Sequence, residues 1–119
     1  MKYLLTVLLF AGLFSTGCRS SANKGLMSID SMKLVMWDML RADEMYSHMT
    51  LKDSLAKGRR EDIRLYEEVF AAHRITKGYF DSSYKYFASH PADFKILIDS
   101  LDAFSARERS KVFNFGQGH

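Results

Sequence analysis

Residues 91–104, PADFKILIDSLDAF, show the clearest amphipathic pattern of the chain. The apolar side chains recur every three or four residues, at Phe94, Leu97, Ile98, Leu101 and Phe104. This is the spacing of one face of an α-helix. Proline is well suited to the first position of a helix, because the N–H that it lacks would have no partner there. The pattern therefore predicts a helix from Pro91 to about Arg107, with Ser89 or His90 as its cap.

Three stretches upstream of Pro91 have the same helical spacing. The first carries apolar residues along one face, at Met32, Val35, Met36, Met39, Ala42, Tyr46 and Met49. Ser28 or Asp30 can begin this helix and Thr76 the third one, because a short side-chain oxygen accepts the free N–H groups of a first turn. The predicted helices span about residues 30–49, 60–73 and 77–88.

The whole pattern indicates an all-α protein. No stretch alternates apolar and polar residues with the two-residue period of a half-buried strand. The 119 residues, 47% of them hydrophobic, suffice for one small domain with its own core. We expect a small bundle of about four helices over residues 28–106, with a loop around residues 50–60. The charged end of the chain, residues 107–119, is expected to be a disordered tail.

The first 18 residues have the pattern of an export signal. Lys2 precedes an apolar run over residues 3–14, which is too short to span a membrane and has the length of a signal-peptide core. A Ser-Thr-Gly segment leads to Cys18, the only cysteine. This order resembles a bacterial lipobox, with residues 1–17 as signal peptide, a lipid on Cys18 and a flexible tether over residues 18–27. The alternatives are an ordinary signal peptide or a buried N-terminal helix with an isolated cysteine.

Four segments of the sequence together resemble a known family. They are MKLVMWDMLRADEMY (residues 32–46), LYEEVF (65–70), HRIT (73–76) and YFASHP (86–91). With the lipobox in front of them, their order and spacing are similar to a lipoprotein family of the Bacteroidota, domain of unknown function 4296, over residues 26 to about 105. The resemblance implies a lipoprotein of the cell envelope and its helical fold. The family has no assigned activity or ligand.

The residues after Cys18 bear on the direction in which a lipid-anchored domain would face. The resemblance implies that surface export would need a signal rich in acidic residues directly after the cysteine. Here Arg19, Ser20 and Ser21 follow, and the first acid is Asp30. We therefore expect an outer-membrane lipoprotein whose domain faces the periplasm.

The sequence contains no motif that predicts catalysis or metal binding. The histidines, His48, His73, His90 and His119, form no HxxxH pair. The glycines are isolated, so the chain has neither a phosphate-binding loop nor a dinucleotide fingerprint, and it lacks a nucleophile elbow. We expect no enzymatic activity, no metal and no cofactor apart from the lipid on Cys18.

Nucleic acid is not an expected partner. The 17 Lys and Arg residues exceed the 14 Asp and Glu residues only slightly, and the one local basic cluster surrounds Arg59 in a predicted loop. The segment around Thr76 has the outline of a helix-turn-helix, but an acid, Asp81, lies at the exposed start of its second helix. An exported protein also does not meet chromosomal DNA.

Two acids and two tyrosines are the candidate contact residues. Asp43 falls within the apolar face of the first helix, where a carboxylate needs a hydrogen-bond partner, and Asp38 lies off that face. Each acid either contacts a ligand or protein partner, or anchors a structural group such as a tyrosine hydroxyl, a helix N-terminus or Arg74. Tyr79 and Tyr86 form either an exposed aromatic ledge for a peptide or glycan, or a semi-buried edge of the bundle.

These features lead to two hypotheses about function. The first is a lipid-anchored envelope protein whose helical domain is a non-enzymatic interaction or structural module for another envelope protein. The second is a periplasmic carrier or binder of a small apolar ligand or peptide. The methionine-rich face of the first helix would line its cavity, because methionine adapts to irregular shapes.

Overall fold

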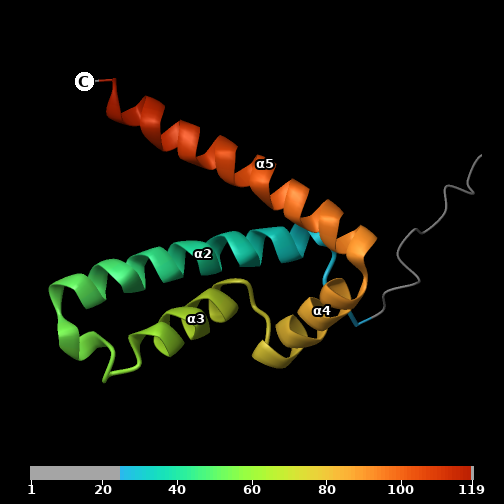
Figure 1. Cartoon of the computed structure of the whole chain (residues 1–119), viewed down its shortest axis with the longest axis horizontal. Helices are drawn as coiled ribbons and strands as arrows, with labels where there is room; N and C mark the ends of the chain where they lie inside the picture. Colours follow the sequence, from blue (N-terminus) through green and yellow to red (C-terminus); the bar gives the residue numbers. More distant parts are fainter. Residues whose placement is uncertain (1–24, 119) are drawn as a thin grey trace, which may run out of the picture.

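A computed structural model describes residues 25–118 of the chain, and this part is all-α, as predicted, without a strand. Its elements are α2 (Ile29–Lys52), η2 (Ser54–Ala56), α3 (Glu61–Ala72), α4 (Lys77–Ser89) and α5 (Pro91–Gly116). α2 and α3 run side by side in opposite directions, and α5 crosses α2 near the start of α2 (Figure 1). Beyond this crossing, α5 and α2 diverge (Figure 1).

The helix starts follow the capping chemistry of the sequence. Ser28 is the N-cap of α2, where its hydroxyl accepts the N–H of Ser31 at 3.1 Å. Thr76 caps α4 in the same way and accepts the N–H of Tyr79 at 3.1 Å. His90 precedes Pro91 at the start of α5 but makes no side-chain cap. Two of the three predicted helix caps therefore make the expected side-chain hydrogen bond.

α3 ends in a left-handed turn at Arg74, whose φ is 55°. The N–H of Ile75 donates to Phe70 O at 3.0 Å, and the N–H of Arg74 donates to Ala71 O at 3.1 Å. These two bonds are those of a Schellman motif, and Ile75 adds its apolar contact by packing against the core. The turn redirects the chain from α3 into α4.

The core is formed by residues of α2, α3, α4 and α5, together with Met27 just before α2. Its buried residues are Met27, Met32, Val35, Phe70, Phe80, Phe87 and Leu97. The apolar stripes predicted for these helices supply most of this set. Ile63, Tyr84 and Ile98 lie on the apolar stripes of the predicted helices but are exposed, whereas Leu65 and Ser83 are buried. α3 packs mainly against α2, so it buries a narrower arc than its apolar stripe.

Met27 corrects the predicted extent of the tether. This residue is only 4% exposed, and its N–H donates to the Ser83 hydroxyl at 2.9 Å. The Ser83 hydroxyl donates in turn to Tyr79 O at 2.9 Å. The last residue of the expected tether is therefore part of the core, because Ser83 offers its backbone a buried partner.

The expectation of a disordered tail from residue 107 is wrong, since α5 continues to Gly116. Arg, Glu and Lys are good helix formers, and the ion pair of Lys111 Nζ with Glu108 Oε1 at 2.6 Å supports this part of the helix. We call residues 105–116 the α5 arm. It points away from the other helices (Figure 1) and exposes Val112, Phe113 and Phe115.

Candidate functional site

Asp38 joins α2 to the end of α3. Its Oδ2 lies 2.7 Å from Nε2 of His73, and both side chains are half-buried. Arg41, one turn further along α2, is 3.9 Å from the other carboxylate oxygen. The geometry is that of a structural anchor between two helices, one of the two roles considered for this acid.

The expectation that Asp43 is buried is wrong, because its side chain is exposed at the edge of the α2–α3 contact. A tyrosine hydroxyl, one of the partners expected for this acid, is present: Tyr66 of α3 donates to Asp43 Oδ1. This hydrogen bond is the main cause that raises the pKa of Tyr66 to about 12, with partial burial as the next cause. The Tyr66 hydroxyl therefore stays protonated at neutral pH and holds the carboxylate in place.

Tyr79 and Tyr86 lie in different surroundings. Tyr79 is exposed at the start of α4, beside Leu34 and Ile75. Tyr86 is half-buried near the end of α4, where its hydroxyl donates to Asp93 Oδ2 at 3.0 Å and its ring stacks on His90. Tyr86 thus links α4 to α5, and the two rings do not share one environment.

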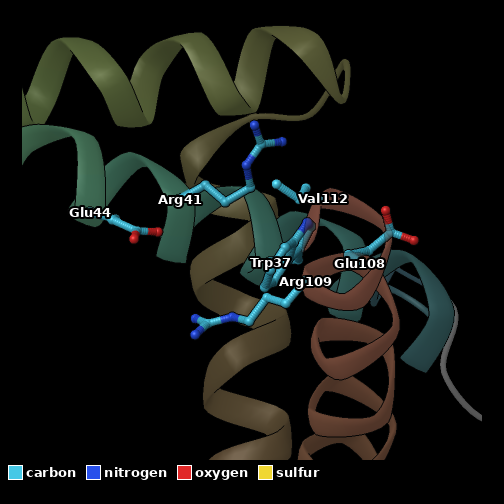
Figure 2. Close-up of a pocket in the computed structure, with 6 residues that line it drawn as sticks. All are labelled: Trp37, Arg41, Glu44, Glu108, Arg109 and Val112. Carbon is cyan, nitrogen blue, oxygen red and sulfur yellow. The ribbon is translucent and has the colours of Figure 1, made fainter. Parts of the chain in front are cut away.

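A cleft opens between α2 and the α5 arm where the two helices diverge. This α2–α5 cleft has a volume of about 350 Å³ and is lined by Trp37, Arg41, Glu44, Glu108, Arg109 and Val112. The Trp37 ring packs edge-on against Phe104 of α5, with 6.0 Å between ring centroids. Figure 2 shows the Arg41 and Arg109 side chains on either side of the indole. The cleft therefore combines an aromatic surface with two flanking guanidinium groups.

Cations lie near the Trp37 ring of this cleft and near the Phe104 ring that packs against it. The Arg109 guanidinium lies 5.9 Å from the Trp37 ring, while Lys33 Nζ and the Arg107 guanidinium lie 5.7 and 6.0 Å from the Phe104 ring. These distances are within the range of cation–π attraction. The lining of the cleft carries two positive residues, Arg41 and Arg109, and two negative residues, Glu44 and Glu108, so both signs of charge stand beside the Trp37 ring. This surface suits a partner that offers charged and apolar side chains.

A second hollow, the apolar groove, lies between α2, α4 and α5. It has a volume of about 430 Å³ and is lined by Met36, Met39, Leu40, Asp43, Phe80, Tyr84, Ile98 and Leu101. The two methionines belong to the face of α2 that the second functional hypothesis places around a ligand. Asp43 is the only charged residue of this lining.

Within residues 25–118, no group of three or more His, Cys, Asp and Glu side chains has the arrangement of a metal site. None of the helices in this described range is long and apolar enough to cross a membrane. Cys18, the predicted lipidation site, lies outside the described residues, as does the predicted signal peptide.

The α2–α5 cleft was not found from the sequence because the predicted last helix stopped near Arg107. A signal was nevertheless present in the chain. Val112 and Phe115 continue the apolar stripe of α5, since Phe115 follows Phe104 by eleven residues, which is three helical turns. The pairing of Trp37 with Arg109, by contrast, depends on the crossing of two distant helices.

Comparison with known proteins shows the family of the chain. A family model described as "Domain of unknown function (DUF4296)" matches residues 24–109. No curated protein and no solved structure matches the chain. Because the family match covers well over half of the sequence, the chain belongs to the DUF4296 family, a domain of unknown function.

Proposed function

We propose that this chain is a lipid-anchored protein of the cell envelope whose helical domain is a non-enzymatic interaction module. The observation that carries the proposal is the α2–α5 cleft, an aromatic surface flanked by two guanidinium groups beside a helical arm with exposed apolar residues. Contiguous exposed apolar surface rimmed by polar groups is typical of a site for protein interaction. The membrane, through the lipid, and an envelope protein would be its partners.

The lipid anchor is supported by the sequence around Cys18. A single cysteine directly after an apolar run and small residues has the order of a lipobox. We expect a fatty-acid analogue to label the wild-type chain in cells and not the Cys18→Ala variant, which should also leave the membrane fraction. Unchanged labelling of the variant would remove this part of the proposal.

The orientation is tested separately from the anchor. The first acid after Cys18 is Asp30, so we propose an outer-membrane location with the domain on the periplasmic side. Protease added to intact cells should leave the domain uncut, and the same protease should digest it once the outer membrane is permeabilised. Digestion in intact cells would show a surface-facing domain.

The interaction surface is tested with a photo-crosslinking residue in the lipidated chain. Placed at Val112, in the cleft, it should yield a defined crosslinked species. The control position is Ser82, which is exposed on α4 and outside the cleft lining. Arg109→Glu should reduce the yield from Val112, because it reverses the charge beside Trp37, whereas Lys85→Glu on α4 should leave it unchanged. Equal yields from Val112 and Ser82 would contradict the proposal.

The apolar groove favours a second candidate function, the binding of a small apolar ligand. Its volume lies within the range of small-molecule sites, and flexible methionines form part of its wall. Protein purified from its native envelope should then carry acyl chains that mass spectrometry detects. Material free of such chains would favour the interaction module alone.

A further inference from the structure

The apolar groove has a wall built by three helices. Phe80 and Leu101 are each only 8% exposed and form its deepest part, whereas Leu40 of α2 and Ile98 of α5 are partly exposed along its sides. A chain or ring that enters the groove would cover apolar surface that water now contacts. The burial of that surface favours binding.

One carboxylate, that of Asp43, stands in this apolar lining. Asp43 is the last of the α2 residues along the groove, so its charge lies at one end of the apolar surface. The hydroxyl of Tyr66 donates to Oδ1. No other side chain of residues 25–118 bonds to this carboxylate, which leaves Oδ2 available to a further donor.

The charge of the groove discriminates between ligand head groups. An ionised carboxylate attracts an ammonium group and repels a carboxylate or phosphate, and at the exposed Asp43 water moderates both effects. The chain as a whole carries a net charge of +3, so its overall field favours anions. A preference for cations at this groove would therefore have to come from Asp43 itself.

We infer that the apolar groove binds a cationic amphiphile, whose apolar chain lies against Met36, Met39 and Ile98 and whose ammonium head group pairs with Asp43. This inference rests on the second candidate function, apolar ligand binding, and adds the chemical class of the ligand. Tyr66 is a positioning residue in this arrangement, because it orients the carboxylate and lies outside the groove lining.

The test uses the full chain with Cys18→Ala, which carries no lipid, and three probes of equal chain length. Decylamine, decanol and decanoate are titrated calorimetrically at pH 7, below their micelle concentrations. We expect decylamine to bind about tenfold more tightly than decanoate, the ratio that one charge-assisted contact of about 1.4 kcal/mol produces. The affinity for decanol should lie between those for decylamine and decanoate.

Variants separate the head-group contact from the groove. Asp43→Asn should abolish the preference for decylamine while retaining decanol binding. Tyr66→Phe keeps the carboxylate but removes the hydroxyl that orients it, so the preference for decylamine should be reduced and not abolished. Ile98→Asn, at a partly exposed position, places an uncharged polar group on the apolar wall and should weaken the binding of all three probes, with circular dichroism as the check on folding.

The two levels of the proposal fail differently. If the chain that keeps Asp43 bound the three probes equally, the proposed preference for a cationic head group would be overturned. The groove would then remain a site for apolar ligands. Absence of binding by any probe would overturn the second candidate function as well. Light scattering that shows a dimer under those conditions would assign the groove to a second copy of the chain.

Discussion

At the scale of single residues, a few polar side chains hold the packed helices in register. Ser83 is the clearest case, because it is fully buried and uses its hydroxyl both to accept and to donate. Asp38 and Asp43 join α2 to α3 by a histidine and a tyrosine. Such contacts add little free energy each but leave a costly unpaired group when one partner is removed.

Ser83→Ala is predicted to destabilise the protein by about 1–3 kcal/mol, because the buried N–H of Met27 would lose its partner. The neighbouring hydroxyl of Ser82 is exposed, so Ser82→Ala is the matched control and should change stability by less than about 0.5 kcal/mol. Urea unfolding of both variants measures the difference. Equal stabilities would mean that Met27 is not held against α4.

Part of the free energy of unfolding depends on the protonation of the Tyr66 hydroxyl, which changes only at alkaline pH. Its hydrogen bond to Asp43 raises the pKa to about 12 in the folded chain, above the value of about 10 for a free tyrosine. The protonated hydroxyl thus stabilises the fold below about pH 10, and this contribution is lost as pH rises towards 12. The melting temperature of the wild type should exceed that of Tyr66→Phe at pH 8, and the gap should shrink by pH 11.5. A gap independent of pH would contradict the Asp43–Tyr66 contact.

At the scale of elements, the turns set the relative orientation of the helices. The link between α3 and α4 is short, and Arg74 must adopt a left-handed backbone to make it. An L-residue pays roughly 1–2 kcal/mol for that conformation, whereas glycine adopts it freely. The surrounding Schellman hydrogen bonds and the burial of Ile75 hold Arg74 in place.

Arg74→Gly is predicted to be more stable than Arg74→Ala by about 1 kcal/mol, because both remove the side chain and only glycine relieves the backbone strain. Thermal unfolding of the two variants side by side makes the comparison. A more stable alanine variant would show that this residue is not in the left-handed region.

At the scale of the whole molecule, the core is small and shared by four helices, and α5 is an integral part of the fold up to Phe104. Leu97 is fully buried at its centre, whereas Phe94, on the same stripe, is only half-buried. Beyond Phe104 the arm contributes an exposed surface and little core. The same helix thus serves stability in its first half and carries the proposed interaction surface in its second.

Leu97→Ala should lower the free energy of unfolding by about 2–5 kcal/mol, since it removes a fully buried side chain and leaves a cavity. Ile96→Ala, one position away and 54% exposed, is the control and should cost far less. Denaturant unfolding of both variants tests which face of α5 packs against the core. Similar losses for the two would mean that another face of the helix packs inward.

The helices and their starts could be predicted from the sequence because they depend on local chemistry. Spacing of apolar residues along a helix, an oxygen at Ser28 or Thr76 and a proline at position 91 each act within one or two turns. The end of α5 could not be placed in the same way. Charged residues past Arg107 suit a helix as well as a tail, and which state they adopt depends on the whole helix.

The sequence by itself determined the helical class, the apolar stripes, two helix caps and the signal around Cys18 that predicts a lipid anchor. Only the tertiary structure decided which residues meet: Asp43 with Tyr66, Asp38 with His73, and Trp37 with Arg109 across the α2–α5 cleft. The physical reason is that periodicity fixes the face of a helix on which a residue lies. The partner of that face depends on crossing angles and turns, which arise only when distant parts of the chain pack together.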